Sequence, residues 1–308
     1  MSFAIPVKAE GKAGEIVRAA ALLDQGEWQA SIALLEPLLR LNTDELSPTE
    51  AGIAWNLLGT AYQYVGEYQK ARRSFEAALR FLQNSSAPVG QQAAALDNFA
   101  SLQLEVGQTE AARKLRNKAK RLYEAENDHA GIARVSGNLA LIALQRGRFK
   151  EAGRSLAEAF RESGLVREPD PDDIAALYGV QCILALHDRE LSKALNAAEQ
   201  AIGLWQHRHG PQYFMLAYGY IVRGEVHDKR GEYPQAQVDF ENALSLLAKS
   251  PGPDSPSYLT VEFAYAQVLR DAGSKEEALH MENRARAKLG ELRHRECVQC
   301  NLSALTFR

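Results

Sequence analysis

The chain has 308 residues, of which 46% are hydrophobic and 24% are charged, with a formal net charge of −3. This balance disfavours nucleic acid and anionic membrane surfaces as partners, because both attract a concentrated positive charge. No apolar run reaches the roughly 18 residues of a membrane span, and the start of the chain lacks the segments of a signal peptide. Three cysteines are too few for a disulfide framework. We therefore expect a cytoplasmic protein with no membrane or nucleic-acid partner.

Residues 54–81, AWNLLGTAYQYVGEYQKARRSFEAALRF, contain two amphipathic helical patterns joined by a turn at Gly66. Gly59 and Ala71 are small, so the two helix backbones can approach closely. Neither helix can bury its apolar stripe alone, which means that such pairs must stack on one another. The predicted packing stripes consist of Trp55, Leu58, Gly59 and Tyr62 on the first helix, and of Ala71, Phe75 and Ala78 on the second.

The same pattern recurs along the whole chain every 40 to 42 residues. Turn glycines recur with the same period, and the fifth unit has Arg189 in place of the glycine. The recurrence predicts an all-α protein built of seven helix-turn-helix repeats. The residues equivalent to Ala71 are Ser31, Ala112, Ala152, Ala194, Ala236 and Ala278, and the turn glycines are Gly26, Gly66, Gly107, Gly147, Gly231 and Gly273.

Helix-start signals divide the repeats. Ser47 to Glu50 form a capping box, Asp170-Pro171 and Ser255-Pro256 start the fifth and seventh units, and Gly210-Pro211 is a weaker start for the sixth. The loops between units are too short for an interdomain linker. We predict a single solenoid domain over residues 1–292 and a C-terminal tail over 293–308, which caps the stack or lies along a neighbouring surface. The repeats are expected at about 9–42, 48–84, 89–125, 129–164, 171–208, 211–249 and 255–292.

The pattern W-x2-L-G-x2-Y followed by A-x3-F-x2-A, which Trp55 to Ala78 match at every position, resembles the tetratricopeptide repeat. The 40- to 42-residue period and the segment Gly252 to Pro256 look like the kinesin-light-chain class of these repeats, and such extended repeats are also frequent in bacterial proteins. The resemblance implies a right-handed α-solenoid superhelix whose first helices line a concave groove for peptides or extended protein segments. Family members hold complexes together and are not usually catalysts.

The chain shows no nucleophile elbow, phosphate loop or metalloprotease motif. His294, Cys297 and Cys300 form an H-x2-C-x2-C cluster of zinc-binding residue types, but no second well-spaced pair completes a structural site. We interpret the cysteines as two adjacent thiols, leave metal binding and a disulfide open, and predict no enzyme activity and no cofactor. The basic run Arg113 to Arg121 is interpreted as the solvated face of a second helix.

A groove would be lined by first-helix residues that lie one step off the packing stripes. Groove asparagines such as Asn98 and Asn138 would donate to and accept from a peptide backbone. The mixture of apolar, amide and acidic side chains favours a peptide of mixed character. The predicted groove residues are Asn56, Leu57, Thr60, Gln63, Asp97, Asn98, Ser101, Arg134, Asn138, Leu141, Gln145, Glu225, Asp228 and Gln267.

The leading hypothesis is a non-catalytic scaffold or adaptor that binds another protein or a peptide, whose identity the sequence does not give. One alternative is a peptide-sensing regulatory receptor. Such receptors usually carry a DNA-binding helix-turn-helix segment, for which the first 15 residues leave no room. The other alternative is a structural protein that self-associates through its terminal repeats, for example as a homodimer.

Overall fold

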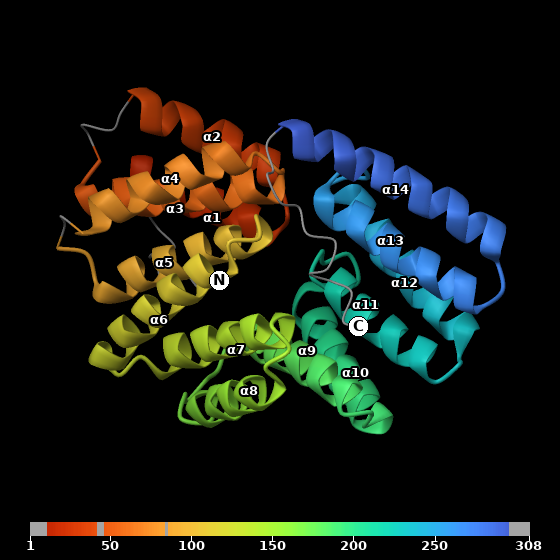
Figure 1. Cartoon of the computed structure of the whole chain (residues 1–308). Helices are drawn as coiled ribbons and strands as arrows, with labels where there is room; N and C mark the ends of the chain where they lie inside the picture. The colour runs from red at the N-terminus through yellow and green to blue at the C-terminus, as the bar shows by residue number, and fades with distance from the viewer. Residues whose placement is uncertain (1–10, 42–45, 84–85, 296–308) are drawn as a thin grey trace. The chain divides into compact units, whose positions relative to one another are not determined.

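The computed structural model describes residues 11–41, 46–83 and 86–295, and within them the chain forms fourteen α-helices and no β-strand (Figure 1). The helices follow one another as antiparallel pairs joined by tight turns. This confirms the predicted all-α solenoid class of helix-turn-helix repeats. No helix in this part of the chain combines the length and the apolar character needed to cross a bilayer.

The chain divides into two compact units, Met1–Val135 and Ser136–Arg308. The helix α7 (His129–Gln145) contains the boundary between them. That residues 1–292 form one continuous solenoid domain remains a prediction. The first unit contains α1 (Lys12–Asp24), α2 (Trp28–Leu41), α3 (Pro48–Tyr64), α4 (Tyr68–Gln83), α5 (Val89–Glu105) and α6 (Thr109–Glu126), and the second contains α8 (Phe149–Ser163), α9 (Pro171–His187), α10 (Leu191–His209), α11 (Leu216–Lys229), α12 (Tyr233–Lys249), α13 (Pro256–Asp271) and α14 (Lys275–Arg295).

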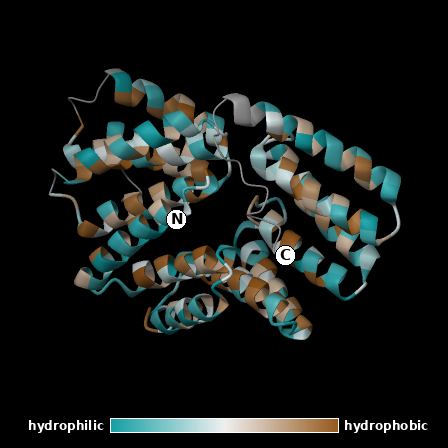
Figure 2. Cartoon of the chain, in the orientation of Figure 1, coloured by the Kyte–Doolittle hydropathy of each residue, from teal (hydrophilic) through white to brown (hydrophobic). Residues whose placement is uncertain are grey.

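The small residue of each repeat lies at the helix-helix contact. Ser31, Ala71, Ala112, Ala152, Ala194, Ala236 and Ala278 are all 0% exposed. A β-carbon added to Gly59 would lie 2.8 Å from the ring of Phe75, and one added to Gly224 would lie 2.9 Å from the ring of Phe240. Each glycine therefore makes room for the aromatic ring of its partner helix, which explains the spacing found in the sequence. Figure 2 shows hydrophobic residues mixed with hydrophilic ones along single helices, as amphipathic packing requires.

Each turn within a helix pair contains one residue whose backbone is in the left-handed conformation, with positive φ. Gly66 has φ +82°, and the turn glycines of the other repeats also have positive φ. Arg189 takes this conformation in the fifth repeat with φ +61°. The prediction that Arg189 replaces the turn glycine is confirmed, and the arginine accepts a backbone conformation that favours glycine.

The helix starts agree with the predicted caps, with one exception. The Ser47 hydroxyl accepts from the Glu50 amide and the Glu50 carboxylate accepts from the Ser47 amide, which completes the capping box. Asp170 and Ser255 also cap their helices through their side chains. The sixth repeat differs, because α11 begins at Leu216 and not directly after Gly210. The intervening turn is held by stacking of Tyr213 on the ring of His209, with centroids 3.8 Å apart.

The last helix is longer than predicted. α14 continues to Arg295, so residues 293–295 of the predicted tail are helical. The rest of the predicted tail, with Cys297 and Cys300, lies outside the described residues, as does the side chain of His294. In the described residues no group of three or more metal-ligating side chains comes together. The remaining cysteine, Cys182, is free and buried, and burial raises the pKa of its thiol to about 12.

Candidate functional site

In the first unit, three of the four predicted groove residues of α3 are buried, and the fourth, Gln63, is partly exposed. Leu57 is 0% exposed, Asn56 is 2% exposed and Thr60 is 4% exposed. The Thr60 hydroxyl donates to the main-chain carbonyl of Asn56 over 3.1 Å. Leu57 is part of the core, and the polar groups of its two neighbours lie within the helix packing. These side chains offer little area to a ligand in this structure.

Amide side chains of the first unit bond to one another across neighbouring repeats. Asn98 Nδ2 donates to Asn56 Oδ1 over 3.2 Å, and Gln63 Nε2 donates to Glu105 Oε2 over 2.8 Å. The hydroxyl of Tyr68 donates to the same Glu105 carboxylate over 2.8 Å. The sequence spacing of 42 between Asn56 and Asn98, and between Gln63 and Glu105, is one repeat. The two amide bonds join α3 to α5 and the Tyr68 bond joins α4 to α5, so all three stabilise the stack of repeats.

Asp97 and Ser101 form a buried hydrogen-bond network with Arg116, a basic residue that was predicted to lie on a solvated helix face. Arg116 was predicted to lie on a solvated face, but it is 3% exposed. Its Nε donates to Asp97 Oδ1 over 3.1 Å and its Nη2 donates to the Ser101 hydroxyl over 3.0 Å. Arg134 donates to the hydroxyl of Tyr123 over 3.0 Å, and its Nε lies 4.0 Å from Asp97 Oδ2. The solvated-face prediction is therefore wrong for Arg116, because a buried carboxylate on α5 needs a counter-ion.

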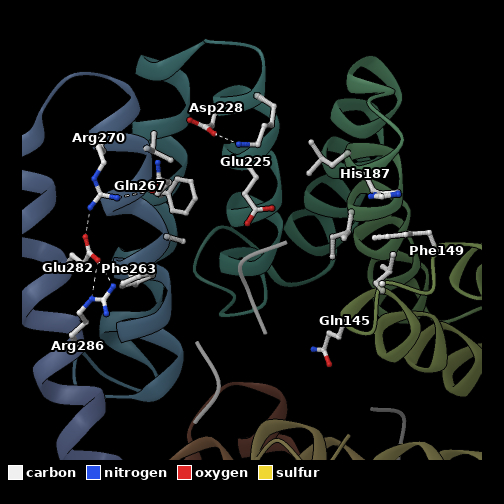
Figure 3. A pocket seen from close by; sticks show the side chains of 18 residues that line it. Gln145, Phe149, His187, Glu225, Asp228, Phe263, Gln267, Arg270, Glu282 and Arg286 are labelled. Carbon is white, nitrogen blue, oxygen red and sulfur yellow. Dashed lines mark hydrogen bonds and ion pairs between the residues drawn. The ribbon is translucent and has the colours of Figure 1, made fainter. Parts of the chain in front are cut away.

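The second unit contains a cavity of about 650 Å³ (Figure 3). Its wall is built mainly from α7, α9, α11 and α13, which are the first helices of four successive pairs. Four of the predicted groove residues, Gln145, Glu225, Asp228 and Gln267, line it together. Asn138 and Leu141 lie on α7 and are partly buried, but they are not among the lining residues.

Two walls of the cavity carry aromatic side chains. Phe149, at the start of α8, stacks on His187 of α9 with ring centroids 3.2 Å apart. Phe263 of α13 lies on the opposite side, under the guanidinium of Arg286 at 5.1 Å from the ring centroid. Partly buried Ile183 adds to the α9 wall. The cavity thus offers apolar surface on two facing walls.

The α13–α14 wall is closed by an ion-pair network. Glu282 accepts from Arg286 Nε over 3.0 Å and Nη2 over 2.6 Å, and it also pairs with Arg270. Arg270 Nη1 donates to Gln267 Oε1 over 2.8 Å. Hydrogen bonds from Arg286, and then those from Arg270, hold the pKa of Glu282 below its usual value. Two arginines pair with one carboxylate on this wall, so one positive charge remains in excess.

The α11 wall carries two acidic side chains, Glu225 and Asp228, and one lysine, Lys229. The side chain of Asp228 is 8% exposed, and its Oδ2 lies 3.0 Å from Lys229 Nζ. Its Oδ1 is buried and has no hydrogen-bond partner among the described residues. Glu225, one turn earlier, is partly buried and points into the cavity. Burial is the main cause that raises the pKa of Glu225 to about 8; Lys229 lowers this pKa and Asp228 adds a smaller upward contribution, and the value includes all three effects.

Several residues that line the cavity were not predicted from the sequence, because they belong to the second helices of their pairs. Phe149, Glu282 and Arg286 were not placed in the groove, which was expected to be lined by first helices alone. Phe149 carried one signal, because it is the aromatic residue that follows a turn glycine. Nothing in the sequence indicated that Glu282 and Arg286 reach the cavity.

We expect Glu225→Gln to stabilise the protein in alkaline solution. The unfolded carboxyl ionises near its ordinary pKa of 4.5, whereas the folded one keeps its proton until about pH 8. The folded wild type therefore loses stability as pH rises through this window, and a neutral glutamine does not. Chemical unfolding should show the variant gaining about 1–3 kcal/mol on wild type between about pH 4 and about pH 9. Glu190→Gln, at an exposed turn carboxylate, serves as the control, and an equal gain there would contradict the assignment.

The sequence profile of the tetratricopeptide repeat matches residues 16–84 and 220–289. A search of curated proteins finds no match. Among solved structures, the chain is similar to the Rap conjugation gene regulator of the plasmid pLS20 in complex with the Phr* peptide, with a TM-score of 0.71, 12% identity, and coverage of 92% of this chain and 74% of that one.

Two further structures share the fold. A Rap protein complexed with Competence and Sporulation Factor has a TM-score of 0.62 and 13% identity, and the match covers 92% of this chain and 98% of that chain. A tetratricopeptide repeat protein from Parabacteroides merdae has a TM-score of 0.50 and 16% identity, with 97% and 100% covered. At these identities the similarity shows the fold alone.

The profile match, the repeat period and the buried small residues lead to the same family. The chain contains tetratricopeptide repeats, matched at residues 16–84 and 220–289. Proteins of this repeat class are generally interaction modules, and the architecture described here is that of a protein-interaction scaffold.

Proposed function

We propose that the second unit binds a short peptide or an extended segment of another protein in its cavity, and that the chain acts as a non-catalytic scaffold or adaptor. The observation that carries this proposal is the cavity itself. It is about 650 Å³ in volume, with aromatic surface on two sides and charged or amide groups between them. A ligand site typically combines apolar walls with a few oriented polar groups in this way.

The size and chemistry of the cavity suit an extended chain. The amides of Gln145 and Gln267 can bond to a peptide backbone, and Phe149 and Phe263 can bury apolar side chains. Two of the similar structures were solved with Phr* peptide and with Competence and Sporulation Factor bound to those proteins. Their fold supports the choice of a peptide over a small metabolite.

The test begins with selection of a displayed library of random short peptides on the full-length protein. We expect wild type to enrich a defined set, and Phe263→Ala to bind the enriched peptides at least about tenfold more weakly, as loss of an aromatic anchor predicts. Leu279→Ala is the control, because Leu279 lies on α14, is 57% exposed and does not line the cavity. Equal affinity in wild type and Phe263→Ala would contradict binding in the cavity.

The two alternative functions predict different results. A self-associating structural protein would enrich no peptide, and its mass in light scattering would rise with concentration. A peptide-sensing receptor would bind the enriched peptides as a scaffold does, but it would also change its radius of gyration in solution scattering when the peptide is added. An unchanged radius with tight binding supports the scaffold.

A further inference from the structure

The charges of the cavity are divided between two walls. On the α13–α14 wall, Glu282 holds Arg270 and Arg286 through direct hydrogen bonds. On the α11 wall, Asp228 pairs with Lys229, whose side chain is 61% exposed, and Glu225 keeps its proton below about pH 8 because burial raises its pKa. Among the residues that line the α11 wall, one lysine thus stands beside two acidic side chains.

One carboxylate oxygen on the α11 wall, Asp228 Oδ1, lacks a hydrogen-bond donor among the residues that the structure describes. Asp228 is more than nine-tenths buried, and its Oδ1 has no hydrogen-bond partner within the described part of the chain. A buried carboxylate oxygen without a donor costs about 1–3 kcal/mol or more, so such oxygens are normally satisfied. Glu225 lies one helical turn away on the same face of α11, lines the same cavity, and has no hydrogen bond to any described residue. Among the described residues, Lys229 donates to Asp228 Oδ2, whereas Asp228 Oδ1 has no donor and Glu225 adds a second acidic group beside it.

We propose that Glu225 and Asp228 form a subsite for a cationic nitrogen group of the bound peptide, a guanidinium or an ammonium. This inference rests on the proposed function and adds the ligand's chemistry to it. A guanidinium has five N–H donors and an ammonium has three, so either can bond to both side chains at once, and Glu225 releases its proton to the solvent when the cation binds. The apolar stem of an arginine or lysine would lie along the α9 wall, beside Ile183 and Leu186. No group of three or more metal-ligating side chains is found among the described residues, so the subsite has fewer protein ligands than a metal site usually supplies.

The same cation can come from a side chain or from the amino terminus of the peptide. To separate these sources, an enriched peptide is made in three forms: unmodified, with its arginine replaced by citrulline or its lysine by norleucine, and with its amino terminus acetylated. Affinities are measured by calorimetry on the full-length protein. We expect one of the two modifications to weaken binding to wild type at least about tenfold, as loss of one partner of a buried charge pair predicts.

The double variant Glu225→Gln/Asp228→Asn tests whether this loss of peptide affinity arises at the subsite. The amides keep the shape of the carboxylates, so circular dichroism should show an unchanged fold. In this variant the sensitive modification should change affinity less than about twofold, because the charge it removes no longer has a partner. Glu190→Gln, which removes an exposed carboxylate outside the cavity, should retain the full tenfold effect. An equal loss in wild type and in the double variant would overturn the proposal.

Failure of the subsite and failure of the proposed function give different results. If peptides are enriched and depend on Phe263, but neither modification changes their affinity, the cation subsite is wrong and peptide binding stands. If no peptide is enriched, the proposed function fails, and arginine amide serves as the probe. Changes in the protein's NMR spectrum that saturate in wild type but not in the double variant would still support the subsite, whereas equal or absent changes would overturn it.

Discussion

The variant Asp97→Ala is expected to lose about 3–5 kcal/mol of unfolding free energy, because it leaves a buried guanidinium without its counter-ion. Arg116 is 3% exposed, and its Nε–H bond is directed at Asp97. The Ser101 hydroxyl that remains is neutral and cannot replace the lost charge. Urea unfolding followed by far-ultraviolet circular dichroism measures the effect.

The control for this prediction removes both charges. Asp97→Leu/Arg116→Met replaces the ion pair with apolar side chains, and such replacements of buried pairs are often neutral or stabilising. We expect the double variant to recover most of the stability that Asp97→Ala loses. If Asp97→Ala costs less than about 1 kcal/mol, the pair is better solvated than the structure shows.

The second large effect is expected for Phe75→Ala, at about 3–5 kcal/mol. Phe75 is fully buried, fills the space over Gly59 of α3, and stacks on Phe99 of α5 with ring centroids 5.8 Å apart. Its removal leaves a cavity shared by three helices, which cannot collapse without moving backbones. Thermal and urea unfolding should both detect the loss.

The repeat symmetry gives this prediction an internal check. Phe240 holds the equivalent position over Gly224 and stacks on Tyr265 at 5.6 Å, so Phe240→Ala should have a similar cost. Val238→Ala is the matched control on the same helix, because Val238 is 55% exposed and should change stability by less than about 0.5 kcal/mol. A loss in Phe75→Ala no larger than that of the control would contradict the packing described here.

The helix pairs, their turns and their contact residues could be predicted from the sequence because each depends on local constraints. A position that admits only a small side chain, such as Ala71, and a turn that needs positive φ, as at Gly66, recur with the period of the repeat. Even the exception at Arg189 was visible, since the surrounding period fixed where the turn must be.

The candidate site was predictable only in part. Glu225 and Asp228, which were predicted as groove residues, line the cavity from α11, whereas Asp97, predicted to be of the same kind, forms a buried ion pair with Arg116. A pairing between residues 97 and 116 depends on how far each helix is rotated about its axis, which a hydrophobic period does not determine to within one residue. The contribution of Glu282 and Arg286 could not be foreseen, because the long last helix reaches the cavity from outside the row of first helices.

The central claim is that a peptide occupies the cavity of the second unit, and site-directed photo-crosslinking tests it most directly. Gln145 is exposed and lines the cavity, whereas Gln206 is exposed on α10 and does not. With a photoreactive phenylalanine derivative at each position in turn, we predict that an enriched peptide crosslinks at position 145, is displaced there by unlabelled peptide, and does not crosslink at position 206. Equal crosslinking at both positions, or crosslinking at position 206 alone, would contradict the account.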